Sequence, residues 1–222
     1  EDLMASHPLI FPNFNPRPAG FKANLAPFAT AGADFTDDWG CVWRTTEDGI
    51  TGTVIRHPLA DWATLDTQPR PDWRVSDGRV PVDRAQISKN LARLKDQGLP
   101  VQGSLRHGHT FLQLCDLLGY EALIMDMADE EPRLDELCDL VGGFNESIVR
   151  WFISEGANWM SFPEDLGMQV GPMLSPAQFR RYIVPIYRRI MRPARAAGCV
   201  LHMHSDGDIR SLGDDMVDSG VN

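Results

Sequence analysis

Short apolar segments alternate with helical segments from residue 81 onward, and this alternation limits the fold more than any other feature. Apolar strands are predicted to begin near residues 100, 121, 158 and 199, and helices are predicted for 83–98, 110–119, 130–155, 175–198 and 208–220. Apolar strands separated by helices form parallel sheets that helices cover. The sequence therefore predicts an α/β protein.

The spacing of these strands favours a (β/α)8 barrel of the TIM type, because intervals of about 20 to 40 residues suit its βα units. An open, doubly wound sheet is the alternative, but no G-x-G-x-x-G pattern follows the first strand. The alternation stops at "DSGVN", where another strand is due. A barrel needs about 250 residues, and the chain has 222. We therefore expect a barrel that is incomplete or truncated at its C-terminal end.

The helix predicted from residue 175 has clear local signals. Ser175 suits the N-cap, Pro176 the first helical position and Gln178 the third position of a capping box. Pro185 and Pro193 are expected to kink or split this helix, because proline has no N–H to donate.

Residues 1–80 are irregular, with many Pro, Gly, Trp and Asp residues. The segment "DFTDDWGCVWRTTEDGITGTVI" is typical of a strand, a turn and a second strand. Trp39 and Trp43 are expected to pack around this hairpin, and an aromatic wall for a flat substrate is the alternative. We interpret residues 1–222 as one domain, with an irregular part (1–80) and a regular part (81–222).

The net charge of −10 and the pI near 5.0 argue against nucleic-acid binding. No apolar run approaches the roughly 18 residues of a membrane helix, and the N-terminal residues lack the pattern of a signal peptide. The four cysteines are far apart and form no CxxC pair, which is typical of reduced thiols. These features predict a cytoplasmic protein that acts on a small molecule.

The segment "VLHMHSDGDI" (200–209) is the strongest candidate for a functional site. Alternate strand residues share a face, so His202 and His204 point the same way, with Asp206 just beyond the strand. Barrel active sites form at this carboxyl end of the strands. The alternative is a strand with a satisfied core histidine that runs into an ordinary helix cap.

Three long segments together resemble the uroporphyrinogen decarboxylase superfamily, and within it the corrinoid-linked methyltransferase branch. The matching features are an acidic-pair loop with a downstream Gln ("EDLGMQ"), an "SP-x-x-F" helix start, and a strand end of the form H-x-[C/S/D]-G. "DDWGCVW" also resembles that branch. The resemblance covers most of residues 35–222 and implies a (β/α)8 barrel with a longer chain.

The resemblance implies a metal site at the end of the last predicted strand. His204 matches the histidine of the branch's His-x-Cys zinc motif, and Asp206 replaces the cysteine. A further ligand would lie beyond residue 222. The alternative is a metal-free site in which His204 and Asp206 act as a hydrogen-bonded acid–base pair.

The exchange of Cys for Asp favours oxygen chemistry, since a carboxylate ligand leaves zinc more Lewis-acidic than a thiolate does. The resulting hypothesis is a metal-assisted methyltransferase that moves a methyl group from a small methoxy-type donor to a corrinoid. Its implied cofactors are zinc and a corrinoid, or methylcobalamin, on a partner corrinoid protein. Barrels of this family are often dimers, so a homodimer is expected.

The acidic loop after the third strand is expected to contribute to the same pocket. The resemblance implies that its acidic pair lines the pocket, and Asp165 is the favoured catalytic member, with Glu164 and Gln169 as substrate-binding neighbours. Asp126, at the end of the predicted strand 121–128, is expected at the pocket rim. A solvated acidic loop is the alternative.

Two basic segments complete the candidate site. "SLRHGHTF" places Arg106, His107 and His109 after a strand. Arg106 is expected to bind an anionic substrate group there. The alternative is that the two histidines are exposed loop residues without a role. "NPRPAGF" resembles the decarboxylase fingerprint R-Q-A-G-R-Y-L at Arg17, but Phe21 replaces its second arginine. The absence of the second arginine disfavours a second hypothesis, in which the protein is a tetrapyrrole decarboxylase and not a methyltransferase. The third is a non-catalytic barrel that binds a corrinoid or a partner.

Overall fold

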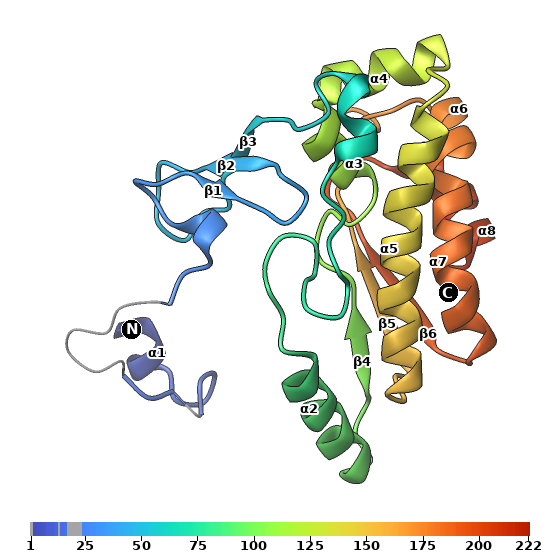
Figure 1. Ribbon diagram of the computed structural model, residues 1–222. Coiled ribbons are helices and arrows are strands. Elements are labelled where there is room, and N and C mark those ends of the chain that lie inside the picture. Colours follow the sequence, from blue (N-terminus) through green and yellow to red (C-terminus); the bar gives the residue numbers. More distant parts are fainter. Residues whose placement is uncertain (1, 13, 17–23) are drawn as a thin grey trace.

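The computed structural model describes residues 2–12, 14–16 and 24–222, which form two separate sheets, and long helices cover one face of the second sheet (Figure 1). The helices are α1 (Asp2–Ser6), α2 (Arg84–Asp96), α3 (Phe111–Leu118), α4 (Tyr120–Asp129), α5 (Leu134–Ser154), α6 (Pro176–Gln178), α7 (Val184–Ala196) and α8 (Gly213–Ser219). The strands are β1 (Phe35–Thr36), β2 (Val42–Arg44), β3 (Thr53–Arg56), β4 (Gln102–Ser104), β5 (Trp159–Pro163) and β6 (Val200–His204). The shorter helical segments are η1 (Pro27–Ala29), η2 (Trp62–Thr67), η3 (Phe179–Ile183) and η4 (Arg210–Leu212). Within the described ranges, no helix is both long and apolar enough to cross a membrane.

The N-terminal sheet is antiparallel, with the order β1-β2-β3. Strands β2 and β3 confirm the predicted hairpin, and β1 extends it. Asp37 holds the turn between β1 and β2. Its Oδ1 accepts hydrogen bonds from the backbone N–H groups of Trp39 (3.0 Å) and Cys41 (2.9 Å), and its Oδ2 accepts a hydrogen bond from the indole Nε1 of Trp43 (2.8 Å). A single buried carboxylate therefore organises the irregular turn.

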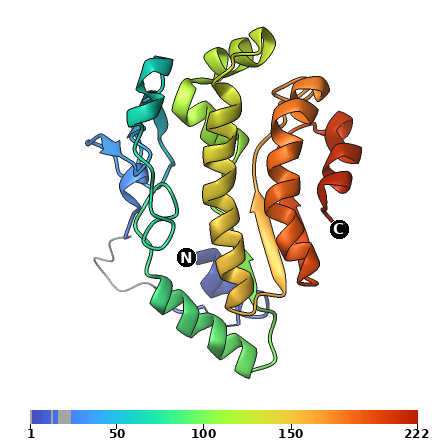
Figure 2. The ribbon, with the colours of Figure 1, turned by 45° about the vertical axis from the view of Figure 1, so that its right-hand side comes forward.

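The second sheet is parallel, with the order β4-β5-β6. Gly103, Met160 and Leu201 are neighbours across the three strands and are buried. Helices α5 and α7 run side by side along this sheet (Figures 1 and 2). A Cβ on Gly103 would lie 2.5 Å from Met160 Sδ and 2.6 Å from Phe152 Cγ. The glycine therefore allows α5 to approach β4 closely.

The opposite face of the parallel sheet carries exposed side chains, among them Val200, His202 and His204 of β6. In a closed barrel, such a face lines the interior. Parallel strands separated by helices confirm the predicted α/β class. Within the described residues, however, the three strands form an open sheet, so the prediction of a (β/α)8 barrel is confirmed only at the level of its α/β architecture.

The strand predicted for residues 121–128 is wrong, because these residues belong to helix α4. Leu123 and Met127, four residues apart, are fully or almost fully buried, while Met125 between them is exposed. This is the period of a helix. A short apolar run cannot be assigned to strand or helix by hydrophobicity alone, and here tertiary packing decided.

The capping box predicted before α6 is present. Ser175 Oγ accepts a hydrogen bond of 3.2 Å from the backbone N–H of Gln178, whose Oε1 accepts one of 3.1 Å from the backbone N–H of Ser175. The chain then passes through the π-helical segment η3 into α7, which has Pro185 in its first turn. The hydrogen-bond pattern thus changes where proline withholds a donor. Helix α7 continues through Pro193, which does not split it.

Candidate functional site

The loops that follow β4, β5 and β6 meet at the carboxyl end of the parallel sheet. They comprise residues 105–110, 164–175 and 205–209. Because all three strands run in the same direction, their carboxyl ends lie at one edge. The parallel pairing of β5 with β6 extends to Pro163 and His204, so the acidic loop begins beside the last residue of β6. Residues far apart in the sequence therefore converge here.

His107, Asp165 and His204 form the centre of this site. One ligand atom from each lies within 4.8 Å of the others. His107 Nε2 is 3.2 Å from Asp165 Oδ2, and His204 Nε2 is 3.7 Å from Asp165 Oδ1. All three side chains are partly exposed, with accessible fractions of 49%, 31% and 47%. A bound ion or substrate would therefore be reachable from solvent.

This donor set fits a divalent transition metal. Two imidazole nitrogens and one carboxylate oxygen hold zinc in catalytic sites and leave a coordination position for water or substrate. The sequence predicted His204 as a ligand but gave His107 no metal role. The signal available for His107 was its position directly after a strand, since no spacing rule links it to a residue almost a hundred positions away. We refer to His107, Asp165 and His204 as the triad.

Asp206 has a different position from the one its sequence motif indicated. Its Oδ1 lies 3.5 Å from His204 Nε2, but its side chain is 80% exposed, and it is not part of the triad. Its backbone N–H instead donates a hydrogen bond of 3.0 Å to Asp165 Oδ1. The structure thus brings Asp206 beside the triad, and its role as a metal ligand stays a prediction.

The loops after β5 and β6 are joined by their backbones. Gly167 N donates to Asp206 O (3.2 Å), and Asp208 N donates to Met168 O (2.7 Å). A Cβ on Gly167 would lie 2.5 Å from the carbonyl carbon of Gly207, and Gly207 itself has a φ of +78°. Two glycines at the crossing therefore let the loops touch, which holds Asp165 beside His204.

Glu164 points away from the triad, although it adjoins Asp165. Its carboxylate is fully buried and accepts hydrogen bonds from the backbone N–H groups of Thr110 (3.0 Å), Phe111 (3.0 Å) and Leu112 (3.3 Å). These are unpaired donors at the start of α3. Burial raises the pKa of Glu164 to about 7, and these hydrogen bonds oppose the rise. Glu164 thus fixes the loop that carries His107, and its predicted contact with substrate has no support in this geometry.

His109 is separated from His107 by one residue but lies in the core. Its Nδ1 is 2.6 Å from Thr110 Oγ1, and its ring packs against Phe162 and Tyr187. Burial lowers its pKa to about 3, so the ring is neutral at physiological pH. Of the two histidines in "RHGH", one is therefore structural and the other belongs to the site.

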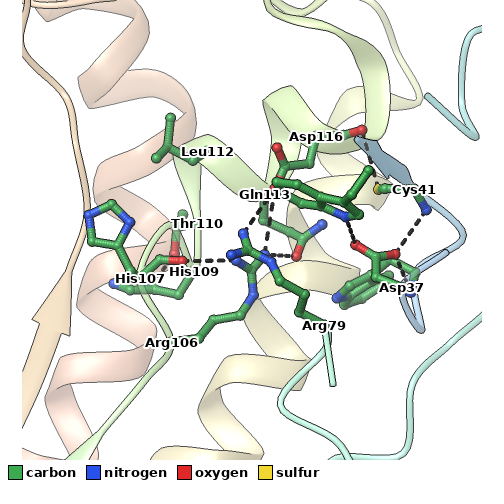
Figure 3. Close-up of polar contacts among 12 residues, drawn as sticks. Asp37, Cys41, Arg79, Arg106, His107, His109, Thr110, Leu112, Gln113 and Asp116 are labelled. Carbon is green, nitrogen blue, oxygen red and sulfur yellow. Dashed lines mark hydrogen bonds and ion pairs between the residues drawn. The ribbon is translucent and has the colours of Figure 1, made fainter. Parts of the chain in front are cut away.

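Arg106 is directed toward Gln113 and Asp116 of α3 (Figure 3). Its guanidinium donates to Gln113 Oε1 and to the backbone carbonyl of His107, and lies 3.8 Å from Asp116 Oδ2. The side chain is 9% exposed. Its predicted role in substrate binding is thus not supported by a position beside His204.

The other candidate residues from the sequence are dispersed. His202 lies on the exposed face of β6, and Gln169 lies in the loop after β5. Asp126 lies on α4, where its Oδ2 accepts a hydrogen bond of 3.1 Å from Trp62 Nε1. This position corrects the expectation of a strand end. Arg17 lies outside the described residues.

Comparisons with known proteins agree with this architecture. The sequence model of the family "Uroporphyrinogen decarboxylase (URO-D)" matches residues 40–222. The chain therefore belongs to the uroporphyrinogen decarboxylase family, as the sequence motifs indicated. No curated protein sequence matches the chain significantly.

Among solved structures, a methyltransferase from Methanosarcina mazei resembles the chain with a TM-score of 0.61. The match covers 83% of this chain and 52% of the methyltransferase, with 16% sequence identity. The chain thus spans about half the length of that structure, and at this identity the likeness shows a shared fold.

Proposed function

We propose that this protein is a metal-assisted methyltransferase, which takes a methyl group from a small methoxy-type donor and delivers it to a corrinoid. The observation that carries the proposal is the convergence of His107, Asp165 and His204 at the carboxyl end of the parallel sheet. The family match and the fold shared with a methyltransferase support the same direction.

The triad would hold zinc, and Asp206 is a further donor at 3.5 Å from His204. When bound, the ion supplies Lewis acidity to the ether oxygen that loses its methyl group. The residues of the chain define where that oxygen lies. Asp165 stands between the two histidines, and the Asp206 backbone N–H keeps the Asp165 carboxylate in this orientation.

In the proposed transfer, the bond between the methyl carbon and the ether oxygen breaks. The electron pair of this bond stays on the oxygen, and a reduced corrinoid on a partner protein would supply the electron pair for the new bond to the methyl carbon. The oxygen then needs a proton. We assign the relay of that proton from solvent to Asp206, because its side chain is exposed and lies 3.5 Å from His204.

The first test is the metal content of the protein and of two variants. We expect about one zinc per chain in the wild type and a loss in His204→Ala. His202→Ala is the matched control, because this histidine shares the strand and its exposed face but is not part of the triad, so it should retain the metal. Zinc that persists in His204→Ala would contradict the site.

The second test is methyl transfer from a series of methoxy compounds to reduced cobalamin, with the zinc-loaded protein. Transfer that depends on His107, Asp165 and His204 would support the proposal. Absence of transfer from every donor, with metal fully loaded, would argue for the non-catalytic role.

Decarboxylation of a tetrapyrrole acid is the second candidate, because the matching family takes its name from that reaction. Such a substrate requires several cationic side chains around its carboxylates. Arg106 faces α3 and not the triad. Release of carbon dioxide from uroporphyrinogen by the purified protein would favour this candidate over methyl transfer.

A further inference from the structure

A cavity of about 640 Å³ lies between the N-terminal sheet and α3, next to the triad. This size falls within the range of small-molecule sites, roughly 300–1,000 Å³. Its apolar walls come from β2, β3 and α3 with the start of α4, and include Trp43, Val54, Leu112, Cys115 and Tyr120. Its ionisable groups, apart from the Cys115 and Tyr120 side chains, are His57, Arg79, Asp116 and His107, and Thr51 and Thr53 add hydroxyl groups. The cavity thus combines apolar walls, two of them aromatic, with a few polar groups.

Arg79 is the main cation of the cavity. Its guanidinium lies over the ring of Trp43, 4.1 Å from the centroid, and near Phe28 at 5.0 Å. The side chain is only 13% exposed, so the guanidinium is held in one orientation. Among the residues that the structure describes, Nε has no hydrogen-bond partner. Because Nε is shielded, a ligand in the cavity would accept hydrogen bonds from the two terminal nitrogens of the guanidinium, Nη1 and Nη2.

Asp116 forms only a loose ion pair with this cation. Its Oδ2 lies 3.7 Å from Arg79 and 3.8 Å from Arg106, too far for a hydrogen bond, and it lacks a partner in the described part of the chain. Burial raises the pKa of Asp116 to about 6, although both arginines oppose the rise. The nearby Asp37 carboxylate is engaged by Trp43 and by backbone N–H groups. Two guanidinium groups thus share one weakly held carboxylate (Figure 3).

His107 connects the cavity to the triad. It lines the cavity, and its Nε2 is 3.2 Å from Asp165 Oδ2. A ligand that fills the cavity therefore has Arg79 among its polar contacts and lies beside a member of the triad. This arrangement can orient one group of the ligand toward the metal site.

We propose that this cavity binds the methyl donor as a small, flat carboxylate, with Arg79 as the residue that recognises the carboxylate. The planar guanidinium forms paired hydrogen bonds with a carboxylate, which a point charge cannot reproduce. The apolar body of the donor packs on Trp43, Leu112 and Tyr120, and its methoxy group lies at the His107 end. The identity of the ligand as a methyl donor rests on the proposed function, whereas the preference for a carboxylate does not.

Three probes of similar shape test the charge preference: 4-methoxybenzoate, 4-methoxytoluene and 4-methoxybenzylamine. Their affinities are measured by calorimetry in the presence of a chelator, so that no metal binds the carboxylate. We expect the benzoate to bind at least about 10-fold more tightly than the neutral probe, as one charged hydrogen bond predicts. Equal binding of the three, or tighter binding of the amine through Asp116, would overturn the proposal.

Variants of Arg79 test the assigned residue. Arg79→Gln should abolish the preference for the benzoate, and Arg79→Lys should restore only part of it. Arg74→Gln is the matched control, because Arg74 is nearby in sequence but exposed, and should bind the benzoate like wild type. Since Arg79 packs on Trp43, Leu112→Trp provides a second route: it fills the cavity, retains Arg79 and should weaken binding of all three probes. Unchanged benzoate binding in folded Arg79→Gln or in Leu112→Trp would contradict the site.

The two proposals fail in distinguishable ways. A carboxylate preference that depends on Arg79, without zinc binding or methyl transfer, would leave the cavity assignment in place and reject the methyltransferase. Conversely, zinc-dependent transfer that is equally fast from neutral and carboxylated methoxy donors would retain the methyltransferase and reject the role of Arg79.

Discussion

The backbone N–H of Asp206 donates a hydrogen bond of 3.0 Å to Oδ1 of Asp165. This bond ties the loop after β6 to the loop after β5 at the carboxylate that faces both histidines of the triad. The side chain of Asp206 takes no part in it and is mostly exposed. The two aspartates are therefore unequal: one belongs to the triad, and the other orients it through the main chain.

Substitutions of these aspartates should affect zinc binding to different degrees. Asp165→Asn removes the charged donor between the histidines, so we expect zinc affinity to fall by more than about 10-fold. Asp206→Asn preserves the backbone hydrogen bond and should cost less than Asp165→Asn. Competition with a chromophoric chelator measures both affinities. A larger loss in Asp206→Asn would show that Asp206 is the metal ligand indicated by the sequence motif.

Gly207→Ala should destabilise the protein by about 1–3 kcal/mol. Gly207 has a φ of +78°, and a Cβ there would overlap the backbone of Gly167. Gly213→Ala is the control, because its Cβ would meet open space in a helix. Urea unfolding of the two variants gives the comparison. The zinc affinity of Gly207→Ala should also fall, because the crossing of the loops positions Asp165. Equal stabilities of the two variants would contradict the tight crossing of the loops.

Glu164→Ala should lower the free energy of unfolding by about 2–5 kcal/mol, since it leaves buried N–H groups of α3 without acceptors. The same substitution should weaken zinc binding, because Glu164 anchors the loop of His107. Glu121→Ala, at an exposed position on α4, should have little effect on either quantity. Thermal unfolding and zinc titration are the two measurements. Wild-type zinc affinity in a folded Glu164→Ala protein would exclude the positioning role.

His109 should make the protein sensitive to acid. Burial lowers its pKa to about 3 in the folded state, from the ordinary histidine value near 6.5. Between these values the unfolded state binds more protons, so stability falls as pH drops, by up to about 1.4 kcal/mol per pH unit for one proton. His109→Phe cannot titrate, and its stability should fall less between pH 6.5 and pH 4 than that of wild type. The free energy of unfolding of both proteins is measured across this pH range. Equal slopes would show that His109 is charged in the folded protein, which would contradict the prediction.

The predicted elements that succeeded were those with local signals. The capping box at Ser175 and Gln178 and the long amphipathic helix α5 follow from spacing and hydrogen-bond chemistry within a few residues. The strand prediction for residues 121–128 was wrong because a short apolar run carries no such signal. Its helical form became evident from the burial of Leu123 and Met127 against other elements.

The candidate site shows the same division. His204 and Asp206 could be found because they lie two residues apart at the end of a strand, and Asp165 because of its place in the acidic loop. His107 could not be separated from His109, since both follow the same strand and differ only in what surrounds them. Likewise, their adjacent positions in the sequence do not separate Glu164 from Asp165. The structure shows that Glu164 accepts hydrogen bonds from the first N–H groups of α3.

The sequence by itself determined the α/β class, the parallel strands, the family and two of the three triad residues, because these depend on periodicity and on motifs of neighbouring residues. The tertiary structure alone decided that His107 joins Asp165 and His204, and that Arg79 and Asp116 meet in a cavity beside them. Those relationships join segments separated by tens of residues. Their distances follow from how the loops cross and how the helices pack, and no local pattern encodes them.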